Sequence, residues 1–118
     1  MLASCQLFTG DCTTAGRPAL VIRVTDAETG DPPEGESKIT ITDGTWTEVH
    51  EGLPDPILGQ YAAAFERPGT YSVLIETPGY QNWNREGVIV RRTGSCDHLA
   101  TVSLTAAIAP LSNSSARY

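Results

Sequence analysis

The 118-residue chain predicts an all-β fold, a single seven-stranded antiparallel β-sandwich. Three observations predict it: about seven short apolar–polar alternations spaced roughly ten residues apart, turn-forming residues in every gap, and no sustained helical period. The sandwich occupies residues 18–110 as one domain. An extended leader, residues 1–17, precedes it, and a flexible tail rich in serine and asparagine, residues 111–118, follows it.

The first three predicted strands are short and separated by clear turn signals. Residues 19–25 alternate between two faces, with Leu20, Ile22 and Val24 on one of them. The turn formers of residues 26–33 cannot continue a central strand. Residues 37–43 alternate again. Asp43-Gly44 is a strong hairpin signal, so residues 45–49 are predicted as the return strand.

The clearest pattern in the chain runs from Gln60 to Tyr80. Two alternating runs flank a Pro-Gly turn, so this stretch is interpreted as a β-hairpin whose second strand ends at Pro78-Gly79. The predicted inward-facing residues are Tyr61, Ala63 and Phe65 on the first strand and Tyr71, Val73 and Ile75 on the second.

The last third of the domain contains two further predicted strands. Residues 80–87 are predicted as a polar and aromatic loop leading to a strand at residues 88–92. Residues 98–110 then form the last long strand. Its apolar face carries Val102, Leu104, Ala106 and Ile108.

Composition and charge exclude two classes of partner. Fourteen acidic residues against eight basic ones give a net charge of −6, and the densest basic pair is Arg91-Arg92. Nucleic-acid binding needs a clustered positive surface, so this class is excluded. No apolar run approaches the ~20 residues that span a bilayer, so membrane association is expected only through a lipid anchor.

The three cysteines suggest the compartment. Leu2-Ala3-Ser4-Cys5 is similar to a bacterial lipobox, whose cysteine is lipidated on export, and the alternative is an ordinary cysteine in a flexible tail. Lipidation of Cys5 would leave Cys12 and Cys96 to form a disulfide, preferred over a Cys5–Cys12 pair because it closes a longer loop. We therefore expect an extracytoplasmic location, in a bacterial envelope or secreted.

No residue set predicts an active site. Cys96-Asp97-His98 groups a thiol, a carboxylate and an imidazole, but neighbouring strand residues point to opposite faces, so Asp97 would not orient His98. A disulfide-bonded cysteine beside an edge histidine explains the same residues. The second histidine, His50, has no zinc-ligand spacing to the first.

A calcium hypothesis rests on one acidic turn. Asp26, Glu28 and Asp31 bring three carboxylates into a single loop, although such turns are usually only solvated. Neither a metal nor any other cofactor is predicted.

Three aromatic residues in or next to loops are the best ligand-binding candidates. Trp46, Tyr80 and Trp83, with amides interleaved around the last two, have the composition of a sugar-stacking platform. The alternative is packing, with Tyr80 plugging the end of the sandwich and Trp83 covering the open edge of its core.

Several motifs between Pro18 and Pro110 resemble one β-sandwich family. They are Val24–Pro32, Gly59-Gln60-Tyr61, Pro68–Val73 and Pro78-Gly79-Tyr80. This pattern resembles the carboxypeptidase regulatory-like, or transthyretin-like (prealbumin-like), modules, and the resemblance implies a Greek-key β-sandwich. With the lipobox-like start, the chain also resembles small bacterial exported lipoproteins of this fold that have no assigned activity.

The enzymatic members of that family differ from this chain. The relatives that hydrolyse 5-hydroxyisourate carry a C-terminal Tyr-Arg-Gly-Ser and paired histidines, whereas this chain ends Ala116-Arg117-Tyr118. We therefore predict a non-catalytic binding or structural module. Its expected partner is a protein, or another copy of itself, bound through sheet edges. A polysaccharide bound by the three aromatic residues is the alternative.

Overall fold

The computed structural model describes residues 16–55, 59–94 and 97–111, and this part of the chain is all-β with no helix. Its nine strands are β1 (Pro18–Asp26), β2 (Ser37–Asp43), β3 (Trp46–Gly52), β4 (Tyr61–Phe65), β5 (Gly69–Glu76), β6 (Trp83–Val90), β7 (Arg92–Thr93), β8 (His98–Leu99) and β9 (Val102–Ile108). The all-β prediction is confirmed.

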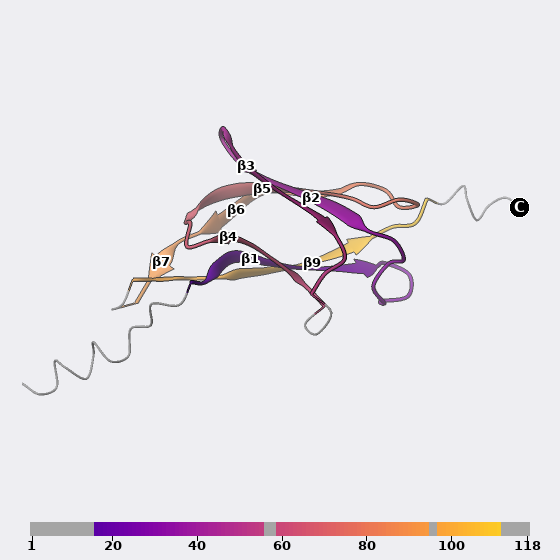
Figure 1. Cartoon of the computed structure of the whole chain (residues 1–118), viewed down its shortest axis with the longest axis horizontal. Helices are drawn as coiled ribbons and strands as arrows, with labels where there is room; N and C mark the ends of the chain where they lie inside the picture. The colour runs from indigo at the N-terminus through magenta and orange to yellow at the C-terminus, as the bar shows by residue number, and fades with distance from the viewer. Residues whose placement is uncertain (1–15, 56–58, 95–96, 112–118) are drawn as a thin grey trace, which may run out of the picture.

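The strands form two main sheets and one small ribbon. One sheet has the order β4-β1-β9, the other has the order β3-β2-β5-β6, and β7 pairs with β8 alone. Figure 1 shows the two main sheets as two layers, with the chain entering β1 at one end of the molecule and leaving β9 toward the other. Within the described residues, no helix is long and apolar enough to cross a bilayer.

The core lies between the two layers and draws on both. Buried side chains alternate along the strands, as in β5, where Tyr71, Val73 and Ile75 are at most 1% exposed. Each fully buried large apolar side chain contributes roughly 1.5–3 kcal/mol through the water it excludes. The residues of this core are Ala19, Leu20, Ile22, Val24, Ile39, Ile41, Tyr61, Ala63, Ala64, Tyr71, Val73, Ile75, Val88, Val90, Leu99, Leu104, Ala106 and Ile108.

The prediction of a wholly antiparallel fold is wrong in one sheet. β1 pairs with β4 antiparallel but with β9 parallel, in an unbroken register from Leu20↔Val102 to Asp26↔Ile108. The first and last long strands of the described chain thus run side by side in the same direction. Alternation along a strand identifies its buried face but not the direction of its neighbour.

The predicted β2–β3 hairpin is confirmed. Asp43 pairs with Trp46, so Gly44 and Thr45 form a two-residue loop. Gly44 has a φ of 62°, a value that glycine adopts at no steric cost at the first central position of a type II′ turn.

The predicted Gln60–Tyr80 hairpin is wrong. Its two strands exist, but β4 pairs with β1 in one sheet while β5 pairs with β2 and β6 in the other. The segment between them, residues 66–68, therefore crosses from one layer to the other and is called the crossover below. The Tyr71 hydroxyl donates a hydrogen bond back to the carbonyl oxygen of Arg67 and so ties the start of β5 to the crossover.

The inward orientation predicted for Phe65 is also wrong. Ala64 has a φ of 56°, which breaks the alternation so that Ala63 and Ala64 are both buried. Phe65 is consequently turned outward and is 56% exposed, whereas Tyr61, on the regular part of β4, is buried as predicted.

Two boundaries differ from the sequence prediction. β6 begins at Trp83, within the segment predicted as a loop, because an edge strand facing solvent needs no apolar alternation. A register shift between Tyr71 and Val73 marks a bulge in the β5–β6 pair. The predicted strand at residues 98–110 is divided into β8 and β9 by Ala100 and Thr101.

Candidate functional site

Trp46 lies against the core at the β2–β3 turn. The Arg67 guanidinium lies 4.2 Å from the centre of its ring, and the Tyr71 ring packs edge-on at 5.8 Å. Arg67 also forms an ion pair with Asp43 at 2.9 Å. The Tyr71 and Asp43 contacts both raise the pKa of Arg67, so this group remains a cation that holds the crossover onto the hairpin.

Tyr80 and Trp83 lie at the other end of the four-stranded sheet. The Tyr80 hydroxyl donates to Asp26 Oδ2 at 2.7 Å, and Tyr80 forms an isolated bridge with Pro110. Trp83 is paired with Ile75 and packs partly against the core, with the Arg85 guanidinium 5.1 Å from its ring centre.

The structure does not bring the three predicted ligand-binding aromatics together. Trp46 lies beside Tyr71, whereas Trp83 is paired with Ile75, four residues further along β5, or roughly 13 Å of strand. All three pack partly against the core. This arrangement favours the packing interpretation over a single sugar-stacking platform.

The acidic turn after β1 is held by its own hydrogen bonds. Asp26 accepts from the Tyr80 hydroxyl and from the backbone N–H groups of Glu28 and Thr29. The Tyr80 bond, followed by the Glu28 bond, lowers the pKa of Asp26, and the same pairing raises the pKa of Tyr80. No group of three or more His, Cys, Asp or Glu side chains in the described chain is arranged to hold a metal ion, so the calcium hypothesis gains no support.

A histidine–carboxylate pair that the sequence did not predict lies between the two sheets. Glu48 and His50 project from the same side of β3 and are hydrogen-bonded through Oε2 and Nε2. Glu48 also accepts from the backbone N–H of Ala64 on β4 at 3.2 Å. The pair therefore braces the edge strand of one sheet against the edge strand of the other.

The other predicted sites lie largely beyond the described residues. Cys5, Cys12 and Cys96 all fall outside them, so the predicted lipidation and disulfide remain predictions. His98 is half-buried in β8, and Asp97 precedes it in a turn with a φ of 55°.

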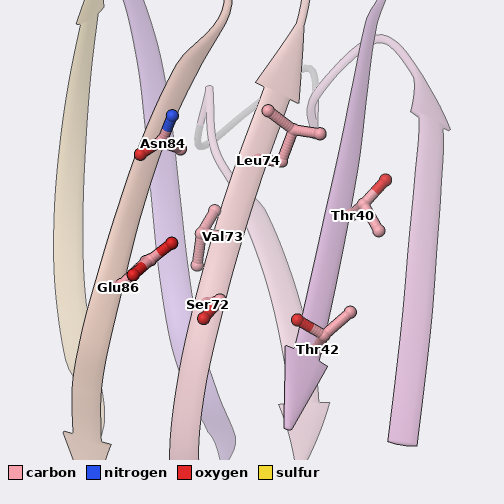
Figure 2. A pocket seen from close by; sticks show the side chains of 7 residues that line it. All are labelled: Thr40, Thr42, Ser72, Val73, Leu74, Asn84 and Glu86. Atoms are coloured by element: carbon pink, nitrogen blue, oxygen red, sulfur yellow. The ribbon is translucent and has the colours of Figure 1, made fainter. Parts of the chain in front are cut away.

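The outer face of the four-stranded sheet carries a shallow hollow of about 290 Å³. In Figure 2 its side chains rise from three neighbouring strands, β2, β5 and β6. The lining residues are Thr40, Thr42, Ser72, Val73, Leu74, Asn84 and Glu86. Hydroxyl, amide and carboxylate groups thus surround Leu74, and the lining includes neither an aromatic ring nor an imidazole.

The strand register explains this composition. Val49, Thr40, Leu74 and Asn84 form one row across the sheet. Because these positions alternate with core positions on every strand, they face away from the other layer. Lys38 lies in a further row between two glutamates, Glu51 and Glu76.

The two main sheets have four edge strands, and three of them are protected against pairing with another chain. β6 contains a bulge and the charges of Arg85 and Glu86; β3 contains Glu48 and Glu51. β4 has only five residues, and the Ala64 N–H is already bonded to Glu48.

The fourth edge strand, β9, lacks charge and a bulge, but backbone hydrogen bonds to the segments that flank β6 hold the chain at both of its ends: Ala100 N–H donates to Arg91, and Gln81 N–H donates to Ala109. It has seven residues without charge or proline, no positive φ, and a register with β1 that shows no shift. Ser103, Thr105 and Ala107 are exposed along it. The absence of charge was visible in the sequence, but the position of β9 at an edge depends on its pairing with β1.

These features define a class of protein, a small two-layer all-β module. No family model, curated protein or solved structure matches the chain.

Proposed function

We propose that this chain is a non-catalytic binding or structural module that acts outside the cytoplasm and engages a protein partner through the middle of the β9 edge. One observation carries the proposal: between its two bonded ends, β9 presents a straight and uncharged edge, whereas the other three edges are charged, bulged or bonded along the strand itself. The unpaired N–H and C=O groups of such an edge accept an added strand from another chain.

The proposed architecture is a transthyretin-like Greek-key β-sandwich built on the seven strands of five or more residues. The alternation of the chain between sheets supports it, because β1, β4 and β9 belong to one layer and the strands between them to the other. The Tyr71–Arg67 bond adds support, because a tyrosine bonded to backbone a few residues upstream is typical of crossovers in Greek-key sandwiches.

The non-catalytic part of the proposal rests on the polar groups that the described residues bring together. The hollow in Figure 2 combines threonine, serine, asparagine and glutamate side chains without a histidine to act as their base. Glu48 is bonded to His50 and also accepts from the Ala64 backbone N–H, which makes the pair a structural brace. The sugar-binding alternative is not carried further, because Trp46 lies beside Tyr71 while Trp83 is paired with Ile75, four residues further along β5.

A peptide probe tests strand addition directly. The probe has the sequence of residues 102–108 flanked by one lysine at each end, and backbone amide exchange of the full chain is followed during titration. We expect saturable protection confined to β9. No protection at about 1 mM peptide, or protection at β3 or β6 instead, would contradict the proposal.

A lipid anchor at Cys5 is proposed on the lipobox-like residues alone, with a Cys12–Cys96 disulfide. Expression of the gene in a bacterium with its own upstream codons and labelled palmitate tests the anchor. Label is expected in the wild type and not in Cys5→Ser. Equal labelling of both proteins would exclude Cys5 as the site.

A further inference from the structure

We infer that the hollow on the outer face of the four-stranded sheet binds a primary alkylammonium group, of the kind found in small aliphatic amines and in the side chain of lysine. This site goes beyond the proposed function, because the hollow lies on the sheet that does not contain β9. Two features of the hollow support it: a single carboxylate at one end and an apolar side chain at the other.

A bulge in β6 sets the position of the carboxylate. The β5–β6 register shifts beside Ser72, where Glu86 and Gly87 together stand opposite this one residue. Gly87 has a φ of 72°, which glycine adopts without steric cost. In Figure 2 the Glu86 carboxylate points from β6 toward β5, so it lies over the hollow rather than away from it.

The charge of Glu86 has no counterpart within the hollow. Among the lining residues it is the only charged one, and within the described parts of the chain it forms no hydrogen bond or ion pair. Its neighbour Arg85 stacks on an aromatic ring instead. Lys38, on the same outer face, lies in the row of Glu76, four residues or roughly 13 Å of strand from Ser72. A cationic ligand is therefore favoured at this position and an anionic one repelled.

The rest of the lining suits an ammonium group that carries an aliphatic chain. Ser72 and Thr42 are a register pair, and their hydroxyls offer acceptors to the ammonium N–H donors near Glu86. Leu74 lies two residues further along β5, at a distance of about 7 Å from Ser72. An extended chain of four carbons and one nitrogen, with bonds of about 1.5 Å, spans roughly 5 Å and so reaches from the carboxylate to contact with Leu74.

Size and composition make other ligands less suitable. The hollow holds about 290 Å³, the lower limit for small-molecule sites, so it accommodates one small group. Calcium takes several oxygen ligands and usually more than one carboxylate, whereas this lining supplies only Glu86. A sugar would find no aromatic ring on which to stack.

Titration of the isotope-labelled full chain with n-butylammonium chloride, followed by amide chemical shifts at constant ionic strength, tests the site. n-Butanol and sodium butyrate are uncharged and anionic probes of similar length. We expect saturable shifts at residues 40–42, 72–74 and 84–86, half complete at about 10 mM n-butylammonium. The other two probes should bind roughly tenfold more weakly or not at all.

Two matched variants separate the carboxylate in the hollow from the overall charge of the chain. Glu86→Gln removes the charge at the bulge, and Glu51→Gln makes the same change at an exposed position on β3. We expect Glu86→Gln to bind n-butylammonium roughly tenfold more weakly and Glu51→Gln to bind it like the wild type. Melting temperatures show whether both variants are folded.

Methylammonium tests the aliphatic contact, because it has the charge without the chain. It should bind several-fold more weakly than n-butylammonium, since it leaves Leu74 uncovered. Equal binding of the two amines, full binding to Glu86→Gln, or shifts confined to other residues would overturn the inference. Calcium chloride that shifts the same amides at lower concentration would also overturn it, in favour of a metal site.

A lysine residue between two capped glycines distinguishes the two sources of this group, with the matching glutamine peptide as its control. Binding of the lysine peptide as tight as that of n-butylammonium would identify the ligand as a lysine side chain of a partner protein. Binding of the free amine alone would identify it as a small molecule. Binding of neither would exclude the site, and the proposal for β9 would be unaffected.

Discussion

The bond between Tyr71 and the Arg67 carbonyl allows one prediction to be developed quantitatively. Tyr71→Phe removes a single oxygen from a ring that is fully buried at the start of β5. The hydroxyl donates to the carbonyl oxygen of Arg67 and lies 3.3 Å from its Nη1. The substitution leaves the packing of the ring unchanged and deletes only these polar contacts.

The expected loss follows from the two contacts. A neutral hydrogen bond contributes about 1 kcal/mol net, and a half-buried carbonyl left without its donor adds to the cost, so Tyr71→Phe should lower the free energy of unfolding by about 1–3 kcal/mol. For a domain of this size, each kcal/mol corresponds to about 4 °C in melting temperature. The melting temperature should therefore fall by roughly 4–12 °C.

Urea unfolding followed by tryptophan fluorescence measures this loss, because Trp46 packs directly against the Tyr71 ring. Tyr80→Phe serves as the control, since its hydroxyl bonds to Asp26 at the surface rather than to the crossover. A loss below about 0.5 kcal/mol for Tyr71→Phe, or one no larger than that of the control, would refute the view that this bond holds the crossover in place.

Three further changes probe other parts of the structure. Gly69→Ala should destabilise the fold by roughly 1–3 kcal/mol in urea unfolding, because the added Cβ would collide with Asp43 Oδ2; an unchanged midpoint would show that the Asp43 side chain moves aside. Since the Tyr80 bond lowers the pKa of Asp26 from 3.8, this carboxylate contributes stability above about pH 4 that is lost as pH falls through its lowered folded-state pKa. The gap in melting temperature between wild type and Tyr80→Phe should therefore shrink toward about pH 2, and a gap independent of pH would contradict this account. Trp83→Ala should cost about 2 kcal/mol without altering the response on a glycan array, whereas loss of a glycan signal in a stably folded variant would restore the sugar-binding interpretation.

The sequence was sufficient for features that depend on neighbouring residues. Strand alternation identified the buried faces of β1, β2, β5 and β9. Asp43-Gly44 identified the β2–β3 hairpin, which forms as predicted. These predictions succeeded because the side-chain period and the turn conformation are set locally.

Features that depend on distant residues were missed. The runs ending at Phe65 and beginning at Gly69 look like a hairpin, but whether two strands share a sheet depends on competing partners such as β1 and β2. The positive φ of Ala64, which turns Phe65 outward, has no signal in an alanine-rich run. The brace between Glu48 and His50 needed the same long-range information, because it forms only where β3 and β4 meet.

The parallel pairing of β1 and β9 has a mechanical consequence. Because the two strands run in the same direction, Pro18 at the start of β1 and Ile108 at the end of β9 lie at opposite ends of this pair, so a force that pulls these residues apart slides the two strands past each other. The seven register pairs from Leu20↔Val102 to Asp26↔Ile108 then bear the load together, whereas peeling would open them one after another. Forced unfolding is governed by the unfolding rate, so we expect a higher rupture force when these two residues are pulled than when the strands are peeled apart.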